Sequence, residues 1–129
     1  MPQTAMDLIA EASDAIETIE VDEARKIHGN ADVLFIDLRE PPEIERTGTV
    51  PGAVTTPRGM LEFAIDPSLP THNEVFSSGK LLVFYCASGG RSALGAKTAQ
   101  DMGLEKICTM AGGFRAWVEA GGETEGGNR

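Results

Sequence analysis

The sequence has few cysteines, few basic residues and no long apolar run, and each shortage excludes a class of protein. Only two cysteines occur in 129 residues, and we expect them as free thiols rather than as a structural disulfide. Lys and Arg number 11 against 20 Asp and Glu, and the net charge of −9 argues against nucleic acid or an anionic membrane as partner. Without an apolar run of about 18 residues, no transmembrane helix is expected.

The remaining composition describes one compact domain. The chain is 41% hydrophobic and 24% charged, which suits a single core at this length. Its first residues are acidic and lack the basic and apolar regions of a signal peptide, so we expect a cytoplasmic protein. His28 and His72 are isolated, and no spacing of histidines or cysteines is typical of a metal site. We therefore expect neither a metal nor a cofactor.

Short apolar runs alternate with helical patterns along the chain. Strands are expected over residues 16–21, 33–38, 53–56, 81–85 and 106–110. Helices are expected over residues 5–15, 22–28, 41–46, 58–65, 73–77, 91–102 and 114–120. This alternation predicts an α/β fold with a parallel sheet of about five strands and helices on both faces. We divide the chain into an N-terminal helix (1–16) packed on the domain, the domain itself (17–120) and a flexible tail (121–129).

The most informative stretch is LLVFYCASGGRSALGAKTAQ, residues 81–100. It places Cys86 at the carboxyl end of a buried strand, which is the edge where open α/β sheets bind ligands. Gly89 and Gly90 let the backbone turn its N–H groups toward an anion. A helix terminus and Arg91 both lower the pKa of a neighbouring thiol, so we expect Cys86 to be an ionised nucleophile. The alternative is a cysteine buried as a small hydrophobic residue.

The segment CASGGR, residues 86–91, resembles the active loop of rhodanese-type sulfurtransferases. Two further stretches are similar to motifs of that family: FIDLREPPEIERTGTVPGAVTTPRG from residue 35 and AGGFRAW from residue 111. The three motifs occur in the family's order and span about residues 17–120. On these motifs the chain is identified as a member of the single-domain thiosulfate sulfurtransferase family, which implies a rhodanese-like fold.

The resemblance implies sulfur transfer by covalent catalysis. Cys86 would attack the outer sulfur of thiosulfate or a similar donor, release sulfite and carry a persulfide to cyanide or a thiol. A protein partner in a sulfur relay is a further expected acceptor. The negative sulfur would be held by the backbone N–H groups of the loop, an electrostatic role like that of an oxyanion hole. These groups belong to Ala87, Ser88, Gly89, Gly90, Arg91 and Ser92.

Two other functions stay open at this point. A cysteine-based phosphatase or arsenate reductase would use the same thiolate, but phosphatase loops place five residues between cysteine and arginine, whereas this loop has four. The shorter loop predicts a ring of N–H groups fitted to one sulfur rather than to a phosphate. The other alternative is a non-catalytic rhodanese-like module that binds partners or senses sulfur. Such modules commonly lack the cysteine that this chain retains.

Other residues at the same sheet edge are weaker candidates. Asp37 and Arg39 follow the second strand and could support the active loop or bind substrate, although a structural pair with Glu43 or the backbone is favoured. Arg58 could steer substrate or form a surface salt bridge. Cys108 lies within a predicted strand, where burial is favoured over a role as resolving thiol. Where many family members have histidine, this chain has Thr49, which leaves the hydrogen bonding of that loop open.

Overall fold

The fold is a single five-stranded parallel sheet covered by helices. The computed structural model describes residues 2–127. The strands are ordered β1-β5-β4-β2-β3, and every neighbouring pair is parallel. Their bounds are β1 (Thr18–Ile19), β2 (Val33–Asp37), β3 (Val54–Thr55), β4 (Leu81–Tyr85) and β5 (Ile107–Met110). The α/β class and the parallel sheet predicted from the sequence are confirmed.

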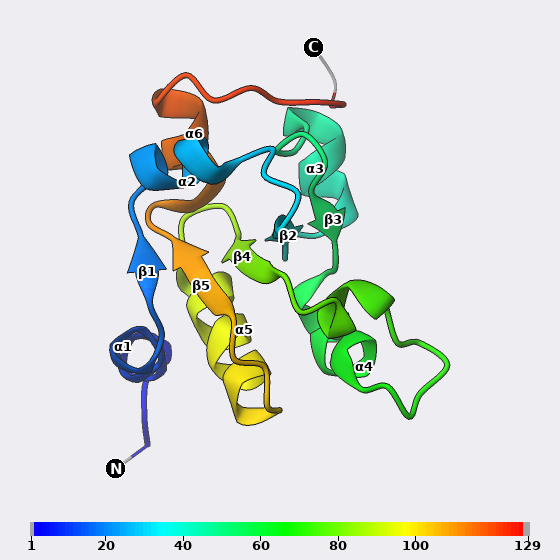
Figure 1. The fold of residues 1–129 in the computed structure, drawn as a ribbon. Helices are drawn as coiled ribbons and strands as arrows, with labels where there is room; N and C mark the ends of the chain where they lie inside the picture. Colours follow the sequence, from blue (N-terminus) through cyan, green and yellow to red (C-terminus); the bar gives the residue numbers. More distant parts are fainter. Residues whose placement is uncertain (1, 128–129) are drawn as a thin grey trace.

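Helices cover both faces of the sheet, as right-handed crossovers between parallel strands require. The α-helices are α1 (Ala5–Ala15), α2 (Val21–Ile27), α3 (Pro41–Thr47), α4 (Leu61–Ile65), α5 (Gly90–Asp101) and α6 (Gly113–Glu119). Two short 3₁₀ segments are η1 (Arg58–Met60) and η2 (Glu74–Ser77). Figure 1 shows α2 and α6 on one side of the sheet and α4 and α5 on the other.

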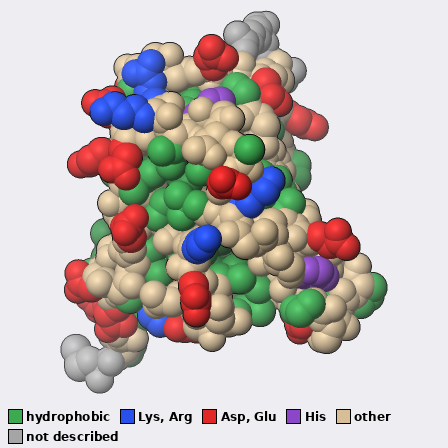
Figure 2. Space-filling model, in the orientation of Figure 1, with side chains coloured by type: hydrophobic (Ala, Val, Ile, Leu, Met, Phe, Trp, Pro, Cys, Tyr) green, Lys and Arg blue, Asp and Glu red, His purple; other side chains and the backbone are tan. Residues whose placement is uncertain are grey.

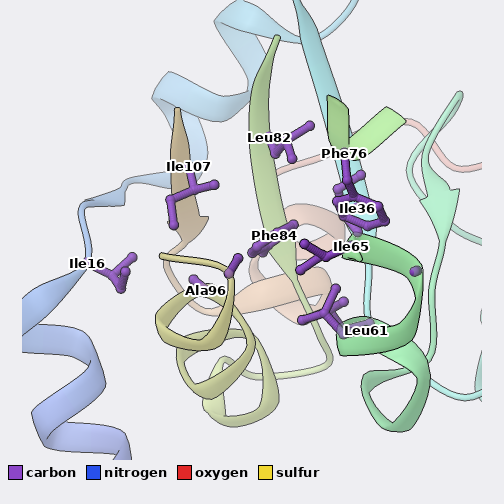
Figure 3. Packing of buried hydrophobic residues seen from close by; sticks show 12 residues of the cluster. Ile16, Ile36, Leu61, Ile65, Phe76, Leu82, Phe84, Ala96 and Ile107 are labelled. Atoms are coloured by element: carbon purple, nitrogen blue, oxygen red, sulfur yellow. The ribbon is translucent and has the colours of Figure 1, made fainter. Parts of the chain in front are cut away.

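The core is apolar on both faces because each central strand is a continuous hydrophobic run. Phe84 of β4 meets Leu61 and Ile65 of α4 and Ala96 of α5 on one face, as Figure 3 shows. The opposite face gathers residues of α2 and α6 around the sheet, with Trp117 only 2% exposed. Burying each large side chain contributes about 1.5–3 kcal/mol, and these two layers hold β4 in the middle of the sheet.

The N-terminal helix α1 begins at a capping box. Thr4 Oγ1 accepts a hydrogen bond from the backbone N–H of Asp7, and the Asp7 carboxylate accepts one from the backbone N–H of Thr4. The helix packs against α5, and the Gln100 side chain donates to the carbonyl oxygen of Ala15 at 3.1 Å. The face of α1 toward the domain buries Ala12 at its centre.

The segment after α6 is held against the domain, where the sequence predicted a flexible tail. Glu125 and Thr49 exchange two backbone hydrogen bonds of 2.9 Å, and Trp117 Nε1 donates to the carbonyl oxygen of Glu123 at 2.6 Å. Gly48 permits this approach, because a Cβ there would lie 2.6 Å from the Glu125 carbonyl oxygen. The contacts reach residues that are distant in sequence, so local composition does not reveal them. Residues 128–129 of the predicted tail lie outside the described residues.

The surface carries the acidic character of the composition. Red acidic side chains are spread over the face in Figure 2, with fewer basic ones between them. Within residues 2–127, none of the helices combines the length and apolar character that crossing a bilayer requires.

Candidate active site

Cys86 lies directly after β4, the central strand of the sheet, and its side chain is 1% exposed. The backbone N–H of Gly89 donates to Cys86 Sγ at 3.1 Å. The thiol in turn donates to Ser92 Oγ at 3.7 Å, and that hydroxyl donates to the Gly89 carbonyl oxygen at 3.1 Å. The loop of residues 86–92 therefore curls around the sulfur and presents polar groups to it.

The loop leads into α5 through Gly89. This residue has φ +130°, a conformation that side-chain-bearing residues rarely adopt, and its carbonyl oxygen accepts the bond from the backbone N–H of Ala93. The amino-terminal end of the twelve-residue helix α5 consequently faces the sulfur. The partial positive charge of this helix end is therefore directed at the place where the sulfur lies.

Helix α6 fixes the other side of the loop through the AGGFRAW motif. The backbone N–H of Phe114 donates to the Cys86 carbonyl oxygen at 2.8 Å, and that of Arg115 donates to the Ala87 carbonyl oxygen at 3.1 Å. A Cβ on Gly113 would lie 2.5 Å from the Cys86 carbonyl oxygen, so only glycine allows this approach. The motif thus ties the amino end of α6 to the residue that carries the thiol.

Arg91, expected to act on the thiol, is paired with Glu43 of α3. Arg91 Nη1 and Nη2 donate to Glu43 Oε1 and Oε2 at 2.7 and 3.0 Å. The Arg91 hydrogen bond lowers the pKa of Glu43 to about 2, and that same bond, opposed by burial, raises the pKa of Arg91, with further contributions from the charges of Glu43 and Cys86. The backbone N–H of Glu40 also donates to Glu43, so the pair joins the loop to the start of α3. From the sequence, Glu43 is expected only as a partner for Asp37 and Arg39, so its pairing with Arg91 is a finding of the structure.

Asp37 and Arg39 form a buried pair with each other. Arg39 Nε and Nη2 donate to the two carboxylate oxygens of Asp37 at 3.0 and 2.8 Å. Arg39 also donates to Thr47 and to the Gly48 carbonyl oxygen, and its guanidinium lies 4.2 Å from the centre of the Phe114 ring. Of the partners expected for these residues, the backbone is contacted, through the Gly48 carbonyl oxygen and the Arg39 N–H, whereas Glu43 is not bonded to either.

Thr49 supplies the hydrogen bonds at the position where many family members have histidine. Its hydroxyl donates to Asp37 Oδ2 at 2.8 Å and lies 2.6 Å from the Tyr85 hydroxyl. The backbone N–H of Val50 donates to the same Tyr85 oxygen at 3.2 Å. Burial, reinforced by the Asp37 charge, raises the pKa of Tyr85. The threonine thereby links β2, β4 and the segment before β3.

The remaining candidates lie away from the sulfur or in the core. Arg58 bonds Glu62 Oε1 at 2.9 Å and Thr98 Oγ1 at 3.1 Å, so its guanidinium ties η1 to α4 and α5 rather than to the loop. Cys108 is fully buried in β5, and burial raises the pKa of its thiol to about 12. Among the described residues, no three His, Cys, Asp or Glu side chains gather as metal ligands.

Two pockets flank the loop. One of about 420 Å³ lies toward α1 and includes Ser88, Gly89 and Gly90 in its wall. The other, of about 470 Å³, lies between α3 and α6 and includes Ala87, Arg46 and Arg115. Neither arginine stands in the loop motif, so sequence reasoning missed both; their only signal is that α3 and α6 each carry a family motif. The loop that holds Cys86 therefore has space for a small molecule on both sides.

The chain is similar in sequence to known proteins. A family model of the rhodanese-like domain matches residues 20–120. The thiosulfate:glutathione sulfurtransferase of Saccharomyces cerevisiae is 31% identical over 116 residues, which cover 84% of this chain and 82% of the yeast protein.

Solved structures have the same fold. A human single-domain sulfurtransferase has a TM-score of 0.65 and 28% identity, covering 79% of this chain and 95% of the human one. A Rhodopseudomonas palustris protein of unknown function, described as a possible tyrosine phosphatase, has a TM-score of 0.91 and 49% identity, covering 97% of this chain and 99% of that one.

Proposed function

Because this chain belongs to the rhodanese-like domain family, we propose that it transfers a sulfane sulfur from thiosulfate or a similar donor to a thiol through a Cys86 persulfide. The observation that carries the proposal is the contact of Cys86 Sγ with the Gly89 N–H inside a loop that begins α5. A cysteine buried only for packing needs no such donor. The similarity to sulfurtransferases supports the class of enzyme, a transferase of sulfur.

The reaction proceeds in two displacements. The Cys86 thiolate attacks the outer sulfur of thiosulfate, the bond from that sulfur to the sulfite group breaks, and sulfite leaves with the bonding electron pair. The persulfide that forms carries its negative charge on the outer sulfur. The acceptor thiolate then attacks this sulfur, and Cys86 leaves as a thiolate, ready for another cycle.

The loop stabilises the charge that moves between these sulfurs. Backbone N–H groups and the amino end of α5 are already oriented, so little reorganisation is needed when the negative charge reaches the outer sulfur. Ser92 can rotate its hydroxyl from the Gly89 carbonyl oxygen toward a negative sulfur, because the two acceptors lie within reach of the same oxygen. Arg91 contributes by fixing the loop to α3 through Glu43.

The Rhodopseudomonas palustris neighbour makes phosphate hydrolysis a second candidate. Hydrolysis of a phosphate ester needs an acid for the leaving group and a loop wide enough for a whole phosphate. The carboxylate beside the loop, Glu43, has a pKa of about 2 and is engaged by Arg91, so it is a poor proton donor at neutral pH. These features favour sulfur transfer.

Mass spectrometry of the intact protein tests the proposal. After incubation with thiosulfate and rapid desalting, the wild type is expected to gain the mass of one sulfur atom, and Cys86→Ser is expected to gain none. Cys108→Ser, which removes the other thiol, is the matched control and should still gain the sulfur. Loss of the adduct in Cys108→Ser but not in Cys86→Ser would contradict the proposal, as would ready hydrolysis of an aryl phosphate by the wild type without sulfur uptake.

A further inference from the structure

The pocket between α3 and α6 adjoins the active loop directly. Its wall includes Ala87, the residue that follows Cys86, and the apolar side chains of Phe114 and Val118. Arg115 is on the same helix, and its backbone N–H bond to Ala87 holds the pocket in a set position relative to the sulfur. At about 470 Å³, the pocket has the size of a small-molecule site.

Three charged side chains of this pocket, two arginines and one glutamate, have no partner among residues 2–127. Arg46 and Arg115 are exposed, and within residues 2–127 neither guanidinium forms an ion pair or hydrogen bond, whereas Arg39 and Arg91 are engaged by carboxylates. Glu119 also lines the pocket, so two free guanidiniums and one free carboxylate leave one net positive charge. This is unusual in a protein of net charge −9, where free arginines would be expected to find carboxylates.

We propose that this pocket binds the sulfur acceptor and that Arg46 and Arg115 select a thiol carrying carboxylate groups. The inference rests on the proposed sulfur transfer and names its acceptor class. Guanidinium groups bind carboxylates through paired, charge-assisted hydrogen bonds, while Phe114 and Val118 offer apolar surface to the carbon chain of the thiol. Thiosulfate and cyanide are compact and have no carbon chain, so the apolar part of the pocket suits a thiol acceptor rather than the donor or cyanide.

Steady-state kinetics with paired acceptors test this assignment. Glutathione, which has two carboxylates, is compared with its diethyl ester, in which both are neutral, using thiosulfate as donor. The double variant Arg46→Gln/Arg115→Gln is expected to raise KM for glutathione about tenfold, which corresponds to about 1.4 kcal/mol of binding. The rise for the diester and for cyanide is expected to be at least about fivefold smaller, because neither offers a carboxylate.

Lys106→Gln is a control variant, since it removes a positive charge far from the pocket, at the amino end of β5. It should leave the ratio of the two KM values unchanged, and thermal unfolding of each variant establishes that it is folded. If the double variant affects glutathione and its diester equally, or if Lys106→Gln changes their ratio as much, the pocket assignment is wrong while sulfur transfer stands. If the wild type takes up no sulfur from thiosulfate, the proposed function itself fails, and this inference fails with it.

Discussion

Two arginine–carboxylate pairs lie near the carboxyl ends of the strands, and they differ mainly in burial. The side chains of Arg39 and Asp37 are 2% and 0% exposed, whereas those of Arg91 and Glu43 are 37% and 25% exposed. Both pairs are bidentate. Each arginine therefore makes at least two hydrogen bonds to its carboxylate. Removing one partner is expected to cost more free energy of unfolding in the buried pair than in the more exposed one.

The difference separates two tasks. The buried pair joins β2 to the Gly48 and Thr49 segment, and a lone charge at that place would be unsolvated. The half-exposed pair joins the active loop to α3, where water can replace either partner. We conclude that the first pair mainly sustains the fold and the second mainly the geometry around Cys86.

The largest expected effect is the loss of the buried carboxylate. Asp37→Ala leaves the Arg39 guanidinium buried without its partner, and we expect the free energy of unfolding to fall by about 3–5 kcal/mol. Urea denaturation followed by circular dichroism measures this change. The double variant Asp37→Leu/Arg39→Met removes both charges and should lose less. A loss below about 1 kcal/mol for Asp37→Ala would mean that water solvates Arg39.

A smaller effect is expected on activity when the half-exposed pair changes. Arg91→Lys keeps the charge but cannot donate two parallel bonds to Glu43, so sulfur transfer should fall about tenfold, nearly as far as in Arg91→Ala. The rate of persulfide formation from thiosulfate is the measurement. Both variants should remain folded in thermal unfolding. Full activity of the lysine variant would show that Arg91 acts only through its charge.

The pH dependence of stability gives a finer test of the same pair. The pKa of Glu43 is lowered from 4.5 to about 2, so the ionised carboxylate stabilises the fold above pH 4.5 and this contribution is lost as the pH falls toward 2. Glu43→Gln lacks this ionised carboxylate. At neutral pH we expect the free energy of unfolding of the wild type to exceed that of the variant by about 1 kcal/mol, allowing for solvent screening. The gap should close between pH 4.5 and 2. A gap that is constant over this range would contradict the assignment.

The smallest effect is expected at Arg58, which forms a surface pair with Glu62. Its side chain is 26% exposed and that of Glu62 is 45% exposed. Arg58→Gln should change the free energy of unfolding by less than about 0.5 kcal/mol, because exposed pairs one helical turn apart contribute little. Sulfur transfer should stay within about twofold of wild type. A larger loss of activity would restore the steering role considered for this residue.

Much of the fold could be predicted because its signals are local. Apolar runs marked the strands, Thr4 marked the start of α1, and the run before Cys86 placed the thiol at the end of β4. The loop motif also predicted that the amino end of α5 lies close to Cys86, since Gly89 and Gly90, where the helix begins, follow Cys86 within four residues. Short-range periodicity and turn chemistry suffice for features of this kind.

Which side chains pair with one another was harder to predict from the sequence. Arg91 and Glu43 are 48 residues apart in the sequence. The Glu125 carboxylate accepts a hydrogen bond from the backbone N–H of Gly52, 73 residues away, and no local sequence pattern predicts this contact. Arg46 and Arg115 also meet at one pocket from different helices. A single sequence gives the residue types at these positions but not which of several carboxylates each arginine reaches.

The sequence alone determined the parallel α/β fold, the strand that ends just before Cys86 and the glycine loop that follows it, because propensity and hydrophobic period act over a few residues. Only the tertiary structure decided that Arg91 joins Glu43, that Asp37 joins Arg39, and that the segment after α6 lies against Gly48. These outcomes depend on how α3 and α6 pack beside the loop, and packing sums many weak contacts between residues far apart in the chain.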